Sequence, residues 1–367
     1  DGESWEVISP DLTRNDVSKM GASGGPITLD TTYVENYGTI FSFAESPHQP
    51  GVFWAGSDDG LVHLSKDFGQ NWQKVTPVNI PEWTRIDVIE VSPHDPATAY
   101  ISATRYKHDD LRPFLYKTKN FGRSWDLISN NLPKNDFTKI IRADTERPGL
   151  LYVGTESGIY VSFDDGTSWQ SLQSNLPIVP VTDLKVKGTE LVIATNGRGF
   201  WILDDLALIR KIPELKNDVH LFKPAATYRF PPPRPETKSS KQDPSPGKHY
   251  SLGLGVAGTF YEKKHSDGRF TKVLLDAGAN PPEGVVVHYF IANDLEDNLT
   301  LEFRDSKGHI LNSYGTQSND KQPRITIKKG INRFVWDMRY PDARSLDIEG
   351  AREKGTRGPI GSPGTYE

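Results

Sequence analysis

The sequence predicts an all-β protein in which about four four-stranded β-propeller blades precede a β-sandwich. Three observations predict this fold. An octapeptide of the form S-x-D-x-G-x-x-W recurs along the first half of the chain, and its tryptophans return at intervals of about 45 to 65 residues. Short strand patterns alternate with turns, and the composition of 32 glycines and 27 prolines leaves few helical periodicities. Units of four short strands with a period of this length are typical of propeller blades.

Composition and charge exclude several classes of function. The chain has 367 residues and a net charge of −5, so we expect no nucleic-acid partner. It contains no cysteine, which excludes disulfides, thiol catalysis and cysteine-type zinc sites. No apolar run approaches the roughly 18 residues of a membrane span, so no membrane span is expected either.

Each residue type of the octapeptide suits a tight turn. The serine and aspartate side chains can hydrogen-bond the turn backbone, the glycine permits positive φ, and the tryptophan buries its ring against the sheet. The second copy has threonine and asparagine in place of serine and aspartate. We therefore interpret the octapeptide residues as structural: Ser65, Asp67, Gly69, Trp72, Thr118, Asn120, Gly122, Trp125, Ser162, Asp164, Gly166 and Trp169.

The repeats define the strands of the blades in chain order. A leading strand follows Trp5, a long loop runs from Ser9 to Tyr37, and a short helix is expected over residues 204–212. Because long loops on β scaffolds often carry function, this loop is itself of interest. The expected blade strands are 38–44, 51–56, 61–64 and 72–75; 85–91, 97–102, 114–117 and 125–128; 138–142, 150–154, 159–162 and 169–172; and 182–186, 190–194 and 200–203.

Three full blades, one partial blade and one leading strand do not close a ring that typically needs 4–8 blades. The sequence also starts inside a copy of the octapeptide, at residues 1–5. An open arc exposes strand edges, which natural proteins avoid. We therefore expect residues 1–216 to form an incomplete ring, whose remaining blades come from another polypeptide or from an excised part.

The second half of the chain differs in composition. Residues 217–250 are rich in proline and charge and are predicted to be a linker. Alternating strands return in residues 251–367, which are predicted to form an immunoglobulin- or fibronectin-like β-sandwich that is truncated at its C-terminus.

Topology selects the candidate ligand residues. In an up-and-down blade, the turn between the second and third strands lies at the end where the first strand begins, here called the top face; the octapeptides lie at the opposite end. The longest and most charged such turn is 105–113. Its polar and aromatic side chains could bind a sugar or a carboxylate, or could only stabilise the loop. Arg85 and Arg198 lie near the expected central channel of the propeller, where each could bind an anion or form an ion pair between blades. The candidate ligand-binding residues are Arg85, Tyr106, His108, Asp109, Asp110, Arg112 and Arg198.

Catalysis has less support in the sequence. A glycosidase needs two carboxyls at a separation of about 5 Å or about 6.5–9.5 Å. Six aspartates could supply such a pair, namely Asp58, Asp59, Asp87, Asp109, Asp110 and Asp183, and Asp109 and Asp183 are the catalytic candidates among them. No serine–histidine–aspartate elbow, phosphate loop or metal-ligand spacing is present. No cofactor or metal is expected; calcium at Asp58–Asp59 or Asp109–Asp110 is the alternative to a solvated acidic turn.

A family resemblance is carried by residues 9–14, 24–28, 36–40, 54–62, 92–96, 161–166 and 197–205. Through these stretches Trp5 to Asp205 resembles the bacterial BNR/Asp-box repeat proteins related to the sortilin (VPS10-type) propeller domain, often labelled glycosyl hydrolase or xyloglucanase-like. Residues 280–282 and 330–341 resemble the β-sandwich that follows in this family. The resemblance implies a secreted, periplasmic or cell-surface bacterial protein and a propeller with more blades. Asn196 departs from it, standing where the family suggests histidine.

Together these observations favour a binding or scaffold module for a glycan or peptide ligand, and they lean away from an enzyme. The alternative is an endo-acting glycoside hydrolase that uses carboxylates of the top face. A structural subunit of an extracellular complex is the third hypothesis. Fold analogy alone cannot choose among them.

Overall fold

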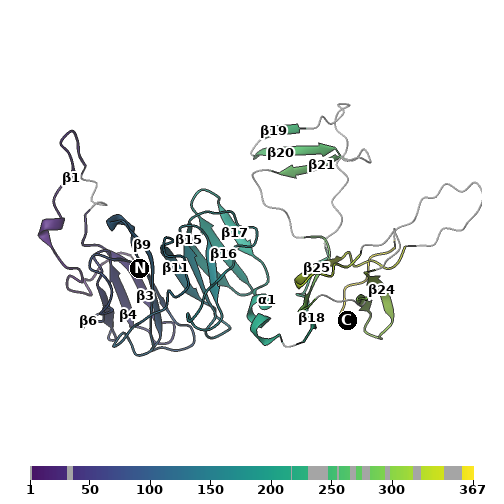
Figure 1. Cartoon of the computed structure of the whole chain (residues 1–367), viewed down its shortest axis with the longest axis horizontal. Coiled ribbons are helices and arrows are strands. Elements are labelled where there is room, and N and C mark those ends of the chain that lie inside the picture. The colour runs from purple at the N-terminus through teal and green to yellow at the C-terminus, as the bar shows by residue number, and fades with distance from the viewer. Residues whose placement is uncertain are drawn as a thin grey trace, which may run out of the picture. The chain divides into compact units, whose positions relative to one another are not determined.

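The computed structural model describes residues 2–30, 36–215, 217–229, 247–253, 256–264, 270–274, 282–293, 298–316, 324–342 and 358–367. The chain divides into two compact units, Asp1–Glu214 and Leu215–Glu367, which are described separately (Figure 1). Within the described part, none of the helices is long and apolar enough to cross a membrane.

The first unit is an arc of four propeller blades, which confirms the predicted fold class. Each blade is an antiparallel sheet whose strands follow in sequence order. The blades are β3 (Ile40–Glu45), β4 (Phe53–Ser57), β5 (Val62–Ser65) and β6 (Gln73–Lys74); β7 (Arg85–Val91), β8 (Ala99–Arg105), β9 (Asp110–Thr118) and β10 (Asp126–Leu127); β11 (Thr138–Ala143), β12 (Leu151–Thr155), β13 (Ile159–Ser162) and β14 (Gln170–Ser171); and β15 (Val181–Lys187), β16 (Glu190–Thr195) and β17 (Phe200–Leu203).

The first strands of neighbouring blades pack against one another, β3 on β7, β7 on β11 and β11 on β15, and so form the inner wall of the arc. Between the blades lie apolar clusters built from alternate strand residues, such as Trp54, Tyr152 and Leu184, which are fully buried. The sheet of the fourth blade leads into α1 (Leu206–Lys211) and η3 (Ile212–Glu214), in place of an octapeptide. The leading segment after Trp5 forms no assigned strand, contrary to the expectation.

Each octapeptide tryptophan hydrogen-bonds the preceding repeat, which is a blade for Trp125 and Trp169 and the leading segment for Trp72. The indole N–H groups of Trp72, Trp125 and Trp169 donate to the carbonyls of Ile8, Val75 and Ile128, at 2.9, 2.7 and 2.7 Å. Each acceptor lies three residues after the preceding tryptophan of the repeat. The octapeptide therefore links two blades as well as bracing its own turn.

The turn itself is held by the serine and aspartate side chains. In the third copy, the Ser162 hydroxyl donates to Asp164 Oδ1 at 2.8 Å and accepts from the Gly166 N–H at 2.9 Å. Gly166 has φ 88°, and a Cβ there would lie 2.6 Å from Ile128 Cδ1 on the preceding blade. Only glycine satisfies both the backbone conformation and this close approach.

Histidines make a second set of links, in the opposite direction. His48 Nε2 lies 2.9 Å from the Ser92 carbonyl, and His94 Nε2 lies 2.7 Å from the Asp144 carbonyl, each on the following blade. At the third blade, Arg210 of α1 makes the corresponding link. It ion-pairs with the buried Asp144 at 3.0 Å and with Glu146 at 2.8 Å. Charged groups thus join the short helix to the third blade.

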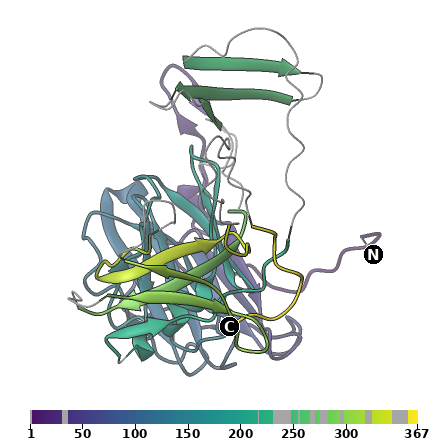
Figure 2. The ribbon, with the colours of Figure 1, turned by 90° about the vertical axis from the view of Figure 1, so that its right-hand side faces the viewer.

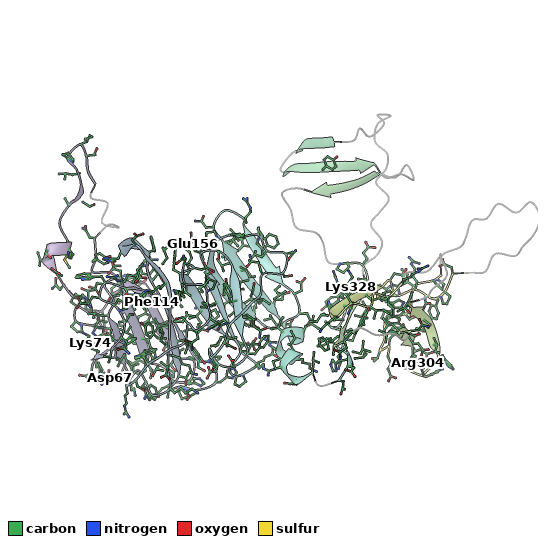
Figure 3. All side chains as sticks on the ribbon, in the orientation of Figure 1. Asp67, Lys74, Phe114, Glu156, Arg304 and Lys328 are labelled. Carbon is green, nitrogen blue, oxygen red and sulfur yellow. The ribbon has the colours of Figure 1, made fainter. Side chains whose placement is uncertain are left out.

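The two ends of the blades carry different turns. Figure 3 shows Asp67, in an octapeptide turn, and Glu156, in the turn between β12 and β13, at opposite ends of the first unit. The top face therefore has the second-to-third-strand turns, as the topology requires.

The segment before β3 contains η1 (Val17–Lys19) and the two-residue strands β1 (Ser23–Gly24) and β2 (Leu29–Asp30), which pair with each other.

The second unit contains two sheets around one core (Figure 2). One sheet joins β18 (Val219–Leu221), β22 (Val285–Ile291) and β25 (Gly330–Trp336), and the other pairs β23 (Thr300–Arg304) with β24 (Ile310–Gly315). Phe303 stacks on Trp336 with ring centroids 4.4 Å apart, inside a cluster of buried aromatic and aliphatic side chains. This packing is the predicted sandwich.

The range predicted as linker, residues 217–250, contains regular structure. Strand β18 pairs with β22 of the sandwich, so the first sandwich strand precedes the proline-rich stretch. A separate sheet of β19 (Gly247–Gly253), β20 (Val256–Lys264) and β21 (Phe270–Leu274) begins at the end of that range. Residues 230–246 lie outside the described residues.

The links between blades yield a stability prediction. Replacing Trp169 by Phe removes the indole donor and leaves the buried Ile128 carbonyl without it, so we expect a loss of about 1–3 kcal/mol in the free energy of unfolding. Trp5→Phe is the matched control, because Trp5 is 90% exposed and its substitution should cost less than about 0.5 kcal/mol. Urea denaturation of both variants measures the difference; equal effects would contradict the assigned role of the bond.

Candidate ligand site

A small pocket lies on the top face of the first two blades. Arg85 begins β7, Arg105 ends β8, and η2 (Tyr106–His108) follows β8 directly. The long segment before β3 contributes Tyr37, so two blades and one loop meet here. The lining residues are Tyr37, Asp58, Trp83, Arg85, Thr104, Arg105, Tyr106, Lys107 and His108.

Arg85 is held in a fixed plane at this pocket. Its Nε donates to Asp87 Oδ1 at 2.6 Å. Its guanidinium carbon lies 4.4 Å from the centroid of the Phe41 ring and 5.5 Å from that of Tyr106. Tyr106 in turn stacks on Phe137 of the third blade, with centroids 5.2 Å apart. Within the described residues, the two terminal nitrogens of Arg85 have no hydrogen-bond or ion-pair partner, so they are available to a ligand.

Aromatic rings form the opposite side of the pocket. Tyr37 packs edge-on against Trp83, with centroids 5.1 Å apart, and its hydroxyl lies 2.9 Å from His108 Nε2. The cations of Arg14 and Lys19 lie 5.3 and 5.8 Å from the Trp83 ring. Burial, together with the charges of Arg105 and Lys19, lowers the pKa of His108, so this imidazole stays neutral to a lower pH than an ordinary histidine does. The pocket thus combines aromatic surface with positive charge.

Among the acidic side chains at the site, Asp87 has the largest shift in pKa. Its side chain is 6% exposed, and its Oδ2 is buried without a hydrogen-bond partner in the described part of the chain. Burial raises the pKa of Asp87 from 3.8 to about 7, although Arg85 and Lys139 act in the opposite direction. A buried carboxyl that titrates near neutrality is a recurrent feature of functional sites.

Irregular strand pairing places these groups at the inner wall. Near the start of each first strand the register with the second strand shifts, and one residue is left out of the pairing. Such bulges re-aim side chains and are common beside active sites. The residues left out are Phe41, Asp87, Lys139 and Thr182, one from each blade.

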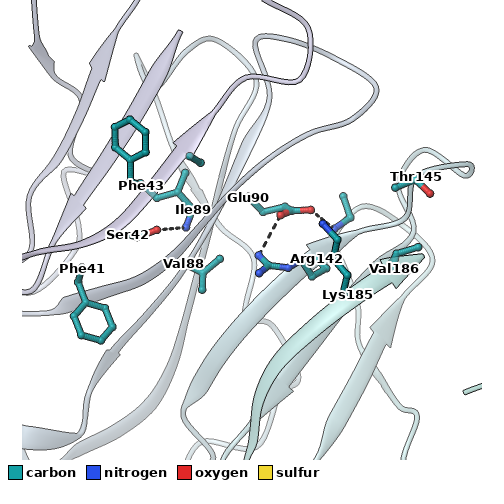
Figure 4. Close-up of a pocket in the computed structure, with 12 residues that line it drawn as sticks. Phe41, Ser42, Phe43, Val88, Ile89, Glu90, Arg142, Thr145, Lys185 and Val186 are labelled. Atoms are coloured by element: carbon teal, nitrogen blue, oxygen red, sulfur yellow. Dashed lines mark hydrogen bonds and ion pairs between the residues drawn. The ribbon is translucent and has the colours of Figure 1, made fainter. Parts of the chain in front are cut away.

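A cavity of about 400 Å³ lies farther along the inner wall (Figure 4). Glu90 of β7 pairs with Arg142 of β11 at 3.2 Å and accepts the Ala143 N–H at 3.1 Å. Arg142 Nε donates to the Leu184 carbonyl of β15 at 2.8 Å. Burial raises the pKa of Glu90, against the charge of Arg142. These polar groups join three blades, and the exposed Lys185 also lines the cavity.

The structure brings together three of the predicted ligand residues, Arg85, Tyr106 and His108. Asp110 and Arg112 form a two-pronged ion pair at 2.8 and 2.7 Å instead, and are not among the lining residues. The expected loop 105–113 is mostly regular, because η2 covers Tyr106–His108 and β9 begins at Asp110. The long turn is therefore shorter than the sequence suggested.

The other candidates lie elsewhere on the first unit. Asp109 is exposed, and its backbone lies in the left-handed region with φ 59°. Arg198 is exposed, and its Nη1 donates to the neighbouring Gly197 carbonyl at 3.0 Å. Asp183 accepts from Arg142 at 3.1 Å and from the Leu184 N–H at 2.8 Å. Neither Asp109 nor Asp183 lines the pocket.

The paired acidic turns are occupied by protein donors. Asp58 accepts the N–H groups of Gly38 and Thr39, both at 2.9 Å, and Asp59 accepts the Arg14 N–H at 2.7 Å. Among the residues that the structure describes, no group of three or more histidine or acidic side chains is placed to hold a metal ion.

Sequence reasoning missed Tyr37, Phe41 and Phe137. A signal was available for the last two, because both are aromatic and lie at or next to the start of a first strand, where the repeats align Phe41 with Asp87 and Phe137 with Arg85. Tyr37 follows the long loop, and only the tertiary structure places its hydroxyl beside His108.

The buried Asp87 predicts a pH dependence of stability. Its folded pKa of about 7 exceeds the unfolded value, so the folded state binds more protons and the free energy of unfolding falls as pH rises from about 4 to 7. Asp87→Asn removes this loss, so we expect a melting temperature above the wild-type value at pH 8, with the difference shrinking toward pH 5. Calorimetry measures it, with the exposed Asp109→Asn as control; a difference independent of pH would contradict the assignment.

Comparison with known proteins finds no matching family and no matching curated protein. Among solved structures, the chain is similar to "YCF48 bound to D1 peptide", with 21% identity, a TM-score of 0.36, and coverage of 45% of this chain and 51% of that chain. It is also similar to the GH74 xyloglucanase from Xanthomonas campestris, with 15% identity, a TM-score of 0.36, and coverage of 69% and 36%. A GH74 enzyme from Niastella koreensis gives 12% identity, a TM-score of 0.37, and coverage of 78% and 38%. The chain thus spans about half or less of the length of these proteins.

Proposed function

We propose that the first unit is a binding module for a peptide or glycan ligand, and that the Arg85 pocket takes a carboxylate of that ligand. One observation carries the proposal: the plane of Arg85 is fixed by Asp87 and two rings, while its terminal nitrogens have no hydrogen-bond partner in the part of the chain that the structure describes. A guanidinium presented in this way matches a carboxylate with two parallel hydrogen bonds.

The rest of the pocket supports an anionic and partly apolar ligand. Arg105 and Lys107 add positive charge, and Tyr37 and Trp83 offer ring surfaces beside it. The cavity itself is only about 10 Å³, so it would admit the carboxylate alone while the rest of the ligand lies against the partly exposed rings. Acidic peptides with an apolar neighbour suit this chemistry better than neutral sugars do.

The glycoside hydrolase alternative has weaker support. Hydrolysis requires two carboxyls that are free to act on the substrate. Around the pocket, Asp58 accepts two backbone N–H groups and Asp87 is paired with Arg85. A purely structural role is the third hypothesis, and it predicts no small ligand at Arg85.

We also propose that further blades, from another polypeptide or from a part of the protein outside this sequence, pack against the exposed faces of the first and fourth blades. Phe43 of β3 is 54% exposed and Phe200 of β17 is 81% exposed, whereas equivalent faces inside the arc are buried. Secretion to the periplasm or cell surface remains part of this proposal and rests on the family resemblance alone.

Phenylacetate, which joins a carboxylate to a ring, is a suitable probe. We expect it to bind the full chain and to shift the Trp83 indole resonance in NMR spectra. Arg85→Lys keeps the charge but loses the two-pronged donor, so affinity should fall about fivefold or more. Arg85→Ala should fall further, while Arg198→Ala, an exposed arginine outside the pocket, should bind as the wild type does.

Phenylacetamide provides the matched neutral ligand and should bind much more weakly. Circular dichroism establishes that each variant is folded before its affinity is compared. Binding that survives both Arg85 substitutions, or equal affinity for the acid and the amide, would overturn the proposed carboxylate site.

A further inference from the structure

We propose that Asp87 is a positioning residue that makes carboxylate binding at Arg85 proton-coupled, so that the site takes up a proton when the ligand binds. The inference rests on the proposed function of the Arg85 pocket. It goes beyond that function because it assigns a role to a buried acid that does not contact the ligand directly.

The geometry makes Asp87 and the ligand share one cation. Asp87 Oδ1 holds Arg85 through Nε at 2.6 Å, and this leaves the two terminal nitrogens for the ligand. The carboxylate of Asp87 and that of the ligand therefore lie on two sides of a single guanidinium. Two negative charges at this spacing repel each other, and the repulsion is strong where water is excluded.

The surroundings do not neutralise the second charge. Asp87 Oδ2 is buried and has no hydrogen-bond partner among the residues that the structure describes. Lys139 of β11 is the other cation that acts on Asp87, and it is already paired with Glu156 at 2.9 Å. From β3 the neighbouring bulge presents the uncharged Phe41, and Arg105 at the end of β8 is near Asp110 at 3.8 Å.

The other titratable groups around Arg85 belong to the pocket. Asp58 accepts two backbone N–H groups, Tyr37 has a pKa raised by burial, and His108 has a pKa lowered by burial. Tyr37 is thus uncharged near neutrality, and His108 gains charge only in more acidic solution than an ordinary imidazole. Asp87 remains the group whose protonation can relieve the repulsion near pH 7.

Linkage fixes the sign of the effect. A bound anion favours the protonated form of a nearby acid, and protonation of that acid must favour the anion by the same factor. Since the pKa of Asp87 is about 7 without ligand, affinity should rise as pH falls from 8 to 6. A ligand-induced rise of about one pKa unit corresponds to an affinity change approaching tenfold.

The test measures phenylacetate affinity of the full chain at pH 6, 7 and 8 by NMR titration. Phenylacetate stays ionised throughout, so the probe adds no titration of its own. We expect wild-type affinity to increase about three- to tenfold from pH 8 to pH 6. Asp87→Asn should bind with little pH dependence and at least as tightly as the wild type at pH 8.

Two further measurements show whether Asp87 or His108 causes the pH dependence of affinity. His108→Gln should retain the pH slope, because the slope belongs to Asp87. In ¹³C NMR spectra, saturating phenylacetate should raise the pKa of the Asp87 carboxyl. Loss of the slope in His108→Gln, or no rise of that pKa, would overturn the inference.

The outcomes also distinguish this inference from the proposed function. Arg85-dependent binding that is flat with pH, or that slopes equally in Asp87→Asn, refutes proton coupling and leaves the carboxylate site standing. Loss of binding by folded Asp87→Asn at every pH means that the charge of Asp87 is required, which also refutes proton uptake. Binding that does not depend on Arg85 at any pH overturns both.

Discussion

The hydrogen bond from each octapeptide tryptophan to the preceding repeat is the interaction on which the first unit depends. A buried indole N–H needs an acceptor, and the partner carbonyl lies on the neighbouring sheet. The same turn brings its glycine against that neighbour. One motif therefore fixes the local turn and the distance between blades, which histidine links in the other direction reinforce.

Blade spacing determines the chemistry of the top face. Arg85 belongs to the second blade, but one ring that holds it, Phe41, belongs to the first blade, and Tyr106 stacks on Phe137 of the third. Asp87 likewise lies near Lys139 of the third blade. The environment of one guanidinium thus depends on three blades in correct register, and a loosened arc would lose the site before its individual sheets unfold.

Net charge does not predict the character of this pocket. The chain as a whole has a charge of −5, whereas arginine and lysine outnumber acids around the pocket. Elsewhere the charges hold elements together: Glu90 and Arg142 join two blades, and Asp144 and Arg210 join the third blade to α1. Buried pairs of this kind contribute little net stability but fix geometry when their hydrogen bonds are complete. The terminal nitrogens of Arg85 differ from these paired groups, because they have no partner within the described residues.

The sequence by itself determined the blades, because the octapeptides and strand periods are local patterns that repeat. Chain topology also indicated Arg85, Tyr106 and His108, since second-to-third-strand turns must lie where first strands begin. Only the tertiary structure revealed the register shifts that aim Phe41 and Asp87, the carbonyl partners of the tryptophans, and the sandwich strand β18 within the predicted linker. These features depend on pairing between distant segments, and no local pattern of residues encodes which partner each backbone group meets.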